Sequence, residues 1–371
     1  MKTIAAVALA VACFAPVVQA QEHEHHHEAE TLGSVSFPIS CTEGTQAAFN
    51  RAVALLHSFA YEDAEQAFTD IATRDPQCGI AWWGVAMTNY HPVWPSPYSP
   101  DELARGIAAA KKAEAVGAKT PRERAYIDAI ATFYRDQKPR AYEEKMAALT
   151  AAYPDDDEAQ IFYALALTAH GMSTPTDKTY TYQKKAAGIL NSLLAKHPDH
   201  PGIAHYLIHS FDYPALAPLA LNAAYAYSKI APSAPHALHM PSHIFVRLGM
   251  WDDTIASNIR SADAAKAHAA DLHPGTMAFN SLHAYDYLTY AYLQRGEDEK
   301  VRKLVDEVSA IKSVDTENFA AYYAIAAIPA RYAVERHRWD DAAALTVRPD
   351  LPWDRYAYAE AMTYFARALG A

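Results

Sequence analysis

Five histidines stand in two closely spaced groups near the middle of the sequence. His205 and His209 occur in H-Y-L-I-H, and His236, His239 and His243 occur in H-A-L-H-M-P-S-H. Residues three or four apart share one face of an α-helix, so each group can direct its imidazole rings at one place. Neutral imidazole is a good ligand for transition metals. The spacing therefore predicts a transition-metal site and leaves open whether the ion is zinc, copper or iron.

Two histidines four residues apart are also the geometry of the His-Glu-x-x-His zinc motif. Here the place of the glutamate is taken by Tyr206 in one pair and by Met240 in the other. Metalloprotease chemistry therefore lacks its general base. The sequence also has no Gly-rich phosphate loop, no nucleophile elbow and no C-x-x-C-H for haem. It assigns no reaction to the chain, and whether the protein is an enzyme stays open.

Pro241 lies inside the second group of histidines. Proline suits the first turn of a helix but removes a hydrogen bond from a helix interior. We therefore expect a helix to begin near Met240, with His236 and His239 in the turn that leads into it. Convergence of these two residues with His243 would then not follow from helical spacing alone.

The amino-terminal residues have the pattern of a secretory signal peptide. Lys2 is followed by an apolar stretch over residues 4–15, and V-Q-A before residue 21 resembles a cleavage site. We expect residues 1–20 to be removed and the protein to be periplasmic or secreted. No later run is long and apolar enough for membrane insertion. The formal net charge of −11 argues against nucleic acid as a partner.

A histidine-rich tract, Q-E-H-E-H-H-H-E-A-E, follows the predicted cleavage site. Short tracts of this kind bind transition metals. We interpret it as a metal-capturing arm in a flexible segment, residues 21–40. A solvated tail without a specific role is the alternative.

From residue 44 onward the pattern is helical nearly throughout, rich in alanine and aromatic residues and without the alternation of strands. The segment Thr45–Pro76 resembles the tetratricopeptide repeat without a gap. Ala52 and Ala64 match its small positions, Tyr61 its aromatic after the turn, and Phe68 its packing aromatic. The resemblance implies an all-α fold: an α-solenoid of about eight such hairpins over residues 41–371, forming a right-handed superhelix with a concave groove and interrupted by a proline-rich insertion at residues 91–100.

The resemblance also predicts which residues line the groove, because positions 2, 5, 9, 12 and 13 of each tetratricopeptide repeat face it. Eight histidines fall on such positions, whereas random placement in a 34-residue repeat would give about two. The eight are His57, His91, His205, His209, His236, His239, His243 and His283. Short segments around them, L-L-H-S-F and H-A-L-H-M-P-S-H-I-F, are similar to those of secreted bacterial tetratricopeptide proteins, which implies no activity.

From these positions we predict two sets of site residues. The metal ligands are His205, His209, His239, His243, His283, His236 and Asp286. The groove residues that contact a bound ligand are His57, His91, Trp83, Tyr90, Tyr290 and Arg331.

Three interpretations of the histidines remain open. The first is a bound transition metal, for trafficking, storage or a metal-dependent activity. The second is a metal-free scaffold that binds a peptide, a protein or a small molecule in the groove. The third is structural, with the imidazoles satisfying buried carbonyls and carboxylates; it applies best to His57 and His209, which are both followed by Ser-Phe.

Cys41 and Cys78 are the cysteines that remain after the predicted processing. They stand 37 residues apart, close to one repeat length, which would place them near each other at the start of parallel helices. Secreted proteins permit disulfides. We therefore predict a disulfide, with two separate thiols as the alternative.

Overall fold

The computed structural model describes residues 30–93 and 98–371. The predicted signal peptide, nearly all of the histidine-rich tract and part of the predicted insertion lie outside these residues. The chain divides into a short unit that ends at Glu30 and a large unit, Thr31–Ala371. Within the described ranges the large unit contains no strand, only an isolated bridge between Met277 and Val314.

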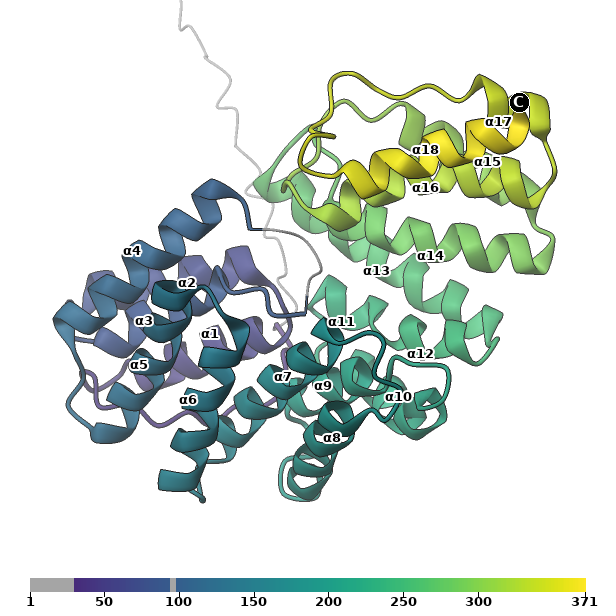
Figure 1. Ribbon diagram of the computed structural model, residues 1–371. Helices are drawn as coiled ribbons and strands as arrows, with labels where there is room; N and C mark the ends of the chain where they lie inside the picture. Colours follow the sequence, from purple (N-terminus) through teal and green to yellow (C-terminus); the bar gives the residue numbers. More distant parts are fainter. Residues whose placement is uncertain (1–29, 94–97) are drawn as a thin grey trace, which may run out of the picture. The chain divides into compact units, whose positions relative to one another are not determined.

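The helices of the large unit follow one another along the whole chain (Figure 1). In its first half they are α1 (Gln46–His57), α2 (Tyr61–Arg74), α3 (Gly79–Thr88), α4 (Pro100–Val116), α5 (Pro121–Asp136), α6 (Pro139–Ala152), α7 (Asp157–Ser173) and α8 (Thr181–Leu194). In its second half they are α9 (Pro201–Phe211), the 3-10 helix η1 (Ala217–Ala220), α10 (Leu221–Ile230), α11 (Pro235–His239), α12 (Pro241–Arg247), α13 (Trp251–Leu272), α14 (Phe279–Arg295), α15 (Asp298–Ser309), α16 (Phe319–Glu335), α17 (Trp339–Ala344) and α18 (Ala357–Gly370).

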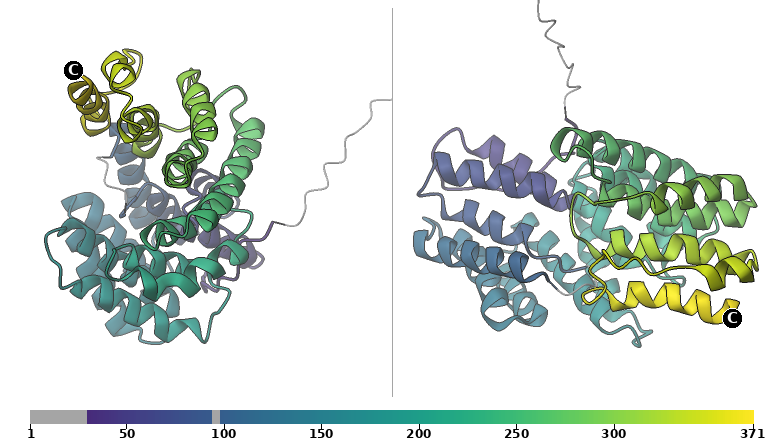
Figure 2. Two further views of the ribbon diagram at one scale, coloured as in Figure 1. Left: turned by 90° about the vertical axis from the view of Figure 1, so that its right-hand side faces the viewer. Right: turned by 90° about the horizontal axis from the view of Figure 1, so that it is seen from above.

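Consecutive helices pack side by side as hairpins, for example α3 with α4, α7 with α8 and α13 with α14 (Figure 2). In the first hairpin, Ala52 and Ala64 are fully buried and let α1 and α2 approach closely. Phe49 and Phe68 fill the space beside them, with ring centroids 5.3 Å apart. The predicted all-α array of tetratricopeptide-like hairpins is confirmed, whereas the handedness of the superhelix stays a prediction.

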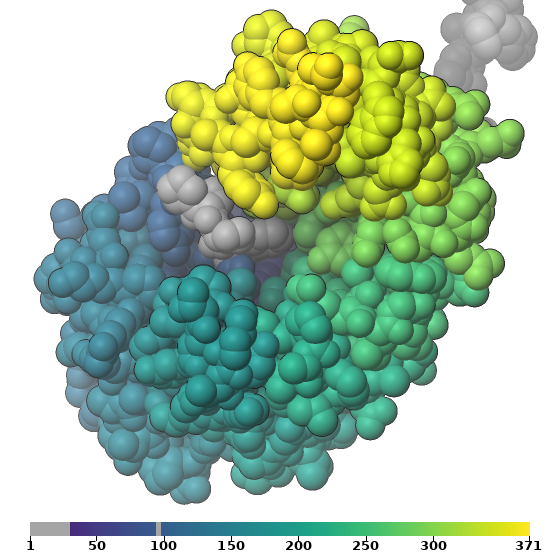
Figure 3. All heavy atoms as spheres, turned by 45° about the vertical axis from the view of Figure 1, so that its right-hand side comes forward, coloured from purple at the N-terminus to yellow at the C-terminus, as the bar shows by residue number. Residues whose placement is uncertain are grey.

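The hairpins occupy the surface of the large unit in the order of the sequence (Figure 3). Helices distant in sequence also meet, because α9 packs against α1 as well as α8 and α10. These contacts bring the end of α1 to the histidines of α9. None of the helices in the described ranges is long and apolar enough to cross a bilayer.

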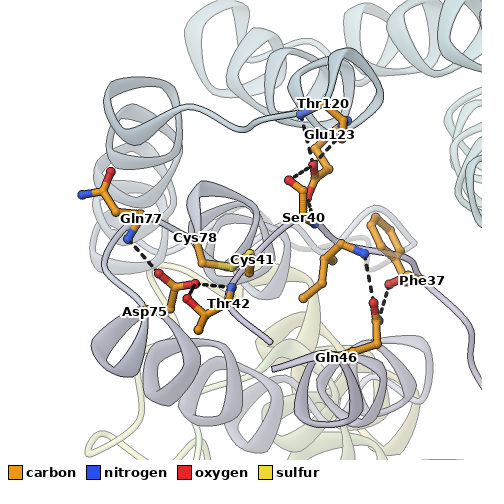
Figure 4. Close-up of a disulfide and its surroundings, with 11 residues drawn as sticks. Phe37, Ser40, Cys41, Thr42, Gln46, Asp75, Gln77, Cys78, Thr120 and Glu123 are labelled. Atoms are coloured by element: carbon orange, nitrogen blue, oxygen red, sulfur yellow. Dashed lines mark hydrogen bonds between the residues drawn. A yellow bond between two sulfur atoms is a disulfide. The ribbon is translucent and has the colours of Figure 1, made fainter. Parts of the chain in front are cut away.

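Residues 31–40 are folded, so the flexible segment predicted up to residue 40 is wrong over this part. Phe37 is fully buried, with its ring centroid 5.2 Å from that of Trp83. The amide of Ser40 donates to the Glu123 carboxylate at 2.8 Å (Figure 4). A buried aromatic side chain and a paired backbone hold this segment against the first hairpins.

Cys41 and Cys78 form the predicted disulfide (Figure 4), with their Cα atoms 5.1 Å apart. The bridge ties the segment before α1 to the residue that precedes α3. Asp75 beside it accepts hydrogen bonds from the amide and the hydroxyl of Thr42, each 2.7 Å long. Because the two sulfur atoms are bonded to each other, neither Cys41 nor Cys78 offers a thiolate that could bind a metal together with Asp75.

Helices α11 and α12 are separated only by Met240, whose backbone stays helical at φ −53° and ψ −35°. Pro241 occupies the first position of α12, where a missing N–H leaves no hydrogen bond unmade. A helix does begin next to Met240, as predicted, but the residues before it form the short helix α11, with His236 and His239 in it, rather than a lead-in turn. Because Met240 is helical, His243 keeps the spacing of one helical turn from His239.

Candidate metal centre

Six histidines from four neighbouring helices meet in one cluster. Their ligand nitrogens form two groups of three, and within each group these nitrogens lie within 4.8 Å of one another. The first triad is His205 and His209 from α9 with His236 from α11. The second triad is His239 from α11, His243 from α12 and His283 from α14. The structure thus brings together all six histidines predicted as metal ligands.

The second triad contains a close contact between two ring nitrogens. Nε2 of His239 lies 3.0 Å from Nε2 of His243. Nδ1 of His239 lies 2.6 Å from Oδ1 of Asn258, and Nδ1 of His243 lies 2.8 Å from Oδ2 of Asp212. Asn258 presents its oxygen because its NH₂ group donates to the Thr254 carbonyl at 2.8 Å. Both Nδ1 atoms therefore donate, and in the neutral rings both Nε2 atoms present lone pairs to each other.

In the first triad, His205 is oriented by the end of α1. Its Nδ1–H donates to the backbone carbonyl of His57 at 2.6 Å, since a carbonyl oxygen can only accept. Its Nε2 therefore presents a lone pair, which lies 3.0 Å from Nε2 of His209 and 3.2 Å from Nε2 of His236.

These nitrogen–nitrogen distances match those between two ligands of one metal ion. Zinc–nitrogen bonds are about 2.0–2.1 Å long, which puts two nitrogen ligands about 2.9 Å apart at a right angle and about 3.4 Å apart at a tetrahedral angle. The three Nε2–Nε2 distances of 3.0, 3.0 and 3.2 Å fall within that range. These three pairs therefore have the spacing that a transition metal requires, and the other ligand nitrogens of each triad lie within 4.8 Å.

Asp212, directly after α9, orients a ligand of the second triad. Its carboxylate accepts from His243 and, through the other oxygen, from Nε of Arg247 at 2.9 Å. Burial by itself raises the pKa of Asp212, but His243 and Arg247 outweigh burial and lower the pKa below its ordinary value. The carboxylate is thus ionised. A carboxylate that holds the far nitrogen of a histidine is the usual support of a histidine ligand.

Burial keeps most of these imidazoles neutral. Burial, reinforced by neighbouring histidines, lowers the pKa of His209 and of His283 to about 3. The same causes place the pKa of His205, His236 and His239 well below its ordinary value. The neutral ring is the form that binds a metal.

The cluster has a buried wall and a more open rim. His205, His236 and His239 are buried, whereas His209, His243 and His283 are half-buried. An ion can therefore reach the cluster along the rim, which holds members of both triads.

Helix α13 supports the buried wall. The Ser257 hydroxyl donates to the Leu238 carbonyl at 2.5 Å, and the Ser261 hydroxyl donates to the Pro235 carbonyl at 2.8 Å. Both serines are buried. These bonds anchor the short helix α11, which supplies one histidine to each triad.

Tyr287 lies against the second triad and was missed by the sequence analysis. Its hydroxyl is 3.1 Å from Nδ1 and 3.3 Å from Nε2 of His243, and its ring centroid is 4.7 Å from that of His239. Burial raises the pKa of Tyr287 well above its ordinary value, so it stays a neutral phenol. The available signal was its position four residues after His283 on one helix. Asn258 was missed too, because nothing in the sequence links it to His239.

Asp286, predicted as a metal ligand, belongs to neither triad. Its Oδ1 lies 2.5 Å from Nη1 of Arg331 on α16, which neutralises the carboxylate. The Arg331 guanidinium also lies over the ring of Tyr290, 5.4 Å from its centroid. These two predicted groove residues are half-buried and form one group with Asp286.

Trp83 and Tyr90 are core residues, so their prediction as groove residues is wrong. Trp83 is fully buried, with a solvent accessibility of 0%. Tyr90 is 2% exposed and packs on Phe133 and Tyr142, with ring centroids 4.4 and 4.9 Å away. The cause is that α3 is apolar on every side and is covered all round.

His57 is also buried, in a hydrogen-bonded network that satisfies both of its nitrogens. Its Nε2–H donates to Oε2 of Glu158 at 2.9 Å, and the Tyr206 hydroxyl donates to its Nδ1 at 2.9 Å. His200 binds the other oxygen of Glu158 through Nε2 at 2.9 Å. His57, Glu158 and His200 lie close enough to hold a metal, but His57 has no nitrogen left for one. The structural interpretation of His57 fits this arrangement.

His91 stands apart from both triads. It is half-buried, and its Nε2 donates to the Thr88 carbonyl at 2.9 Å.

An open pocket of about 550 Å³ lies elsewhere, at the start of α7, and none of the triad residues lines it. Its charged groups pair with one another, as Arg122 with Asp156 at 2.5 Å. The triads are therefore the stronger candidate site.

Comparisons with known proteins locate similar folds only. No protein-family model matches the sequence, and no curated protein matches it. Among solved structures, a tetratricopeptide repeat protein from Parabacteroides merdae is 12% identical over 73% of this chain and 93% of its own, with a TM-score of 0.43. The human IFIT1 dimer with PPP-AAAA is 11% identical over 85% and 72%, with a TM-score of 0.38. The P58(IPK) TPR domain is 12% identical over 88% and 97%, with a TM-score of 0.21. We base no functional conclusion on these similarities.

Proposed function

We propose that the protein binds a first-row transition metal ion at the second triad, His239, His243 and His283. The supporting observation is the 3.0 Å contact between the Nε2 atoms of His239 and His243, whose protons are both committed to the far side of their rings. Two lone pairs this close repel each other unless a cation lies between them. A metal ion bound by both nitrogens would relieve this repulsion.

The donor set narrows the class of ion. Three neutral imidazoles suit zinc, copper, iron or nickel, whereas calcium and magnesium require oxygen ligands. Three protein ligands leave a fourth position for water or a substrate. The site therefore fits metal trafficking, storage or a metal-dependent activity, and the Tyr287 hydroxyl would face the bound ion.

The proposed location is the periplasm or the outside of the cell. The signal-peptide pattern of residues 1–20 supports it. The disulfide between Cys41 and Cys78 supports it independently, because disulfides persist in oxidising compartments. In that setting, the histidine-rich tract would capture ions for the centre.

The test is a zinc competition titration against a chromophoric chelator. The protein carries alanine at His23, His25, His26 and His27, so that the tract contributes no affinity. We expect tight binding in which the zinc ion of the second triad is lost in His243→Ala/His283→Ala, because the one remaining histidine of that triad cannot hold it. His268→Ala removes a histidine outside the cluster and should leave the affinity unchanged. Equal affinity and an equal number of zinc equivalents in all three proteins would refute the proposal.

A metal-free scaffold for a peptide or protein is the second candidate function. The helical-repeat architecture suits partner binding. A specific observation is that α18 exposes large apolar side chains, with Tyr358 66% and Phe365 58% accessible. Partner binding that survives both chelator treatment and His243→Ala/His283→Ala would favour this candidate.

A further inference from the structure

The first triad has the same features as the second and lies directly beside it. His205, His209 and His236 direct Nε2 atoms at one point, with separations of 3.0 and 3.2 Å. A neutral His205 can accept only one hydrogen bond at its Nε2, because its lone pair is single. Hydrogen bonds among the three rings therefore cannot satisfy both contacts.

The two triads adjoin each other at two places. On α11, His236 and His239 are three residues apart, and their ring centroids are 6.1 Å apart. On the rim, His209 and His243 face each other with ring centroids 6.3 Å apart. No helix or side-chain layer separates the triads at these contacts.

The supporting bonds also cross between the triads. Asp212 follows α9, which carries two residues of the first triad, yet it orients His243 of the second. Helix α11 supplies a ligand to each. A change in one triad must therefore reach the other through shared helices, as expected for a single centre.

From this arrangement we propose that the six histidines hold two transition metal ions side by side, one in each triad, as a dinuclear centre. The inference rests on the proposed function and adds a second ion to it. Two-metal sites in enzymes hold their ions about 3.5–4 Å apart, so that one small ligand touches both. Here three imidazoles would hold each ion, and the half-buried histidines of the rim would leave it accessible to a further ligand.

The charges of the ligands indicate which further ligand the two ions would bind. Imidazole ligands add no negative charge to a bound ion, and the carboxylate that orients His243, Asp212, is shared with Arg247. Two divalent ions would therefore attract an anionic oxygen ligand from solution, such as hydroxide. Such a ligand, bound between the ions, is the reactive group that two-metal sites commonly present.

The experiment measures stoichiometry and spin coupling with copper(II) as the probe. The full chain carries alanine at the four histidines of the amino-terminal tract. After loading and dialysis, we expect two equivalents of copper and a paramagnetic resonance signal weaker than the copper content, because adjacent ions couple. In His209→Ala/His236→Ala, we expect one equivalent with full signal intensity. Circular dichroism checks that this variant is folded, and His209→Ala alone, on the rim, serves if it is not.

The matched control removes two histidines outside the cluster. His197 pairs with Asp157 and His268 with Asp63, so His197→Ala/His268→Ala should leave two coupled equivalents. One equivalent in the parent protein, unaffected by His209→Ala/His236→Ala, would overturn the second ion and leave the proposed function intact. Two equivalents with full signal intensity would overturn the dinuclear centre. No retained copper in any protein would overturn both proposals.

Discussion

The carboxylate of Asp212 accepts a hydrogen bond of 2.8 Å from Nδ1 of His243, across the gap between α9 and α12. This bond decides which nitrogen of His243 carries the proton and therefore which nitrogen faces the cluster. The Arg247 guanidinium holds the second oxygen of the same carboxylate at 2.9 Å. Residues outside the triads thus determine the chemical state of the ligands.

Asp212→Ala should weaken metal binding without unfolding the protein. The substitution removes the acceptor for Nδ1 of His243, so the ring can rotate or change tautomer. Loss of such a supporting group costs about 10–100-fold in metal affinity. The measurement is a zinc competition titration. Asp252→Asn, at an exposed carboxylate that pairs with Arg295, is the control and should change nothing. Unchanged affinity in Asp212→Ala would contradict the assigned role.

Gly202→Ala should destabilise the protein and disturb the first triad. A Cβ atom at Gly202 would lie 2.6 Å from Nδ1 of His57, whose carbonyl orients His205. Overpacking of this kind costs about 1–3 kcal/mol. In contrast, Gly188 on α8 has open space at its Cβ position. Gly188→Ala should raise the free energy of unfolding by about 0.5–1 kcal/mol, because alanine has the higher helix propensity. Urea denaturation of both variants checks the pair, and equal effects would contradict the packing argument.

Glu158→Gln should lower the free energy of unfolding at neutral pH and make that free energy less dependent on pH under acidic conditions. Burial by itself raises the pKa of Glu158, but His200 and His57 outweigh it and hold the pKa below the ordinary value of 4.5. The stabilisation is therefore present above pH 4.5 and is lost as the pH falls towards the folded-state pKa. Hydrogen bonds to a charged group each contribute about 1.5–3 kcal/mol, and the neutral amide of Gln weakens those to Glu158.

Urea denaturation at pH 7, 5 and 4 tests this prediction. Burial lowers the pKa of His57 below 6.5, so proton uptake by the unfolded chain also reduces stability below that pH. The difference between the parent protein and Glu158→Gln should shrink only below pH 4.5. Asp155→Asn, at an exposed carboxylate, should follow the parent protein throughout. A constant difference between the parent protein and Glu158→Gln down to acid pH would show that Glu158 is not the group concerned.

Cys41→Ala/Cys78→Ala should lower stability and leave metal affinity intact. The bridge closes a loop of 37 residues, for which the loss of unfolded-state restraint is about 3–4 kcal/mol. It lies beside α1 and α3 rather than at the triads, so the zinc titration should not change. A loss of affinity as large as that of the triad variants would mean that the bridge shapes the centre.

The local part of the site was predictable from the sequence. The spacing of His205 and His209, and of His239 and His243, follows directly from helix geometry. The lead-in turn predicted before His243 was wrong, because a proline in the first turn of a new helix lets the helical path continue through Met240.

Non-local features were not predictable. The carbonyl that orients His205 belongs to His57, 148 residues earlier, and a backbone atom leaves no mark in the sequence. The repeat register places residues on a face but does not show which neighbour covers them. For that reason Trp83 was assigned to a groove although it is buried, and Asp286 was assigned to a metal although Arg331 neutralises it.

The most direct measurement is anomalous diffraction from crystals of the metal-loaded protein, collected on both sides of the absorption edge of the metal. The central claim predicts an anomalous peak bounded by Nε2 of His239, Nε2 of His243 and a ring nitrogen of His283. A second peak among His205, His209 and His236 is predicted by the dinuclear centre. Loaded crystals with no peak at the second triad, or with peaks only at surface histidines such as His268, would contradict the account.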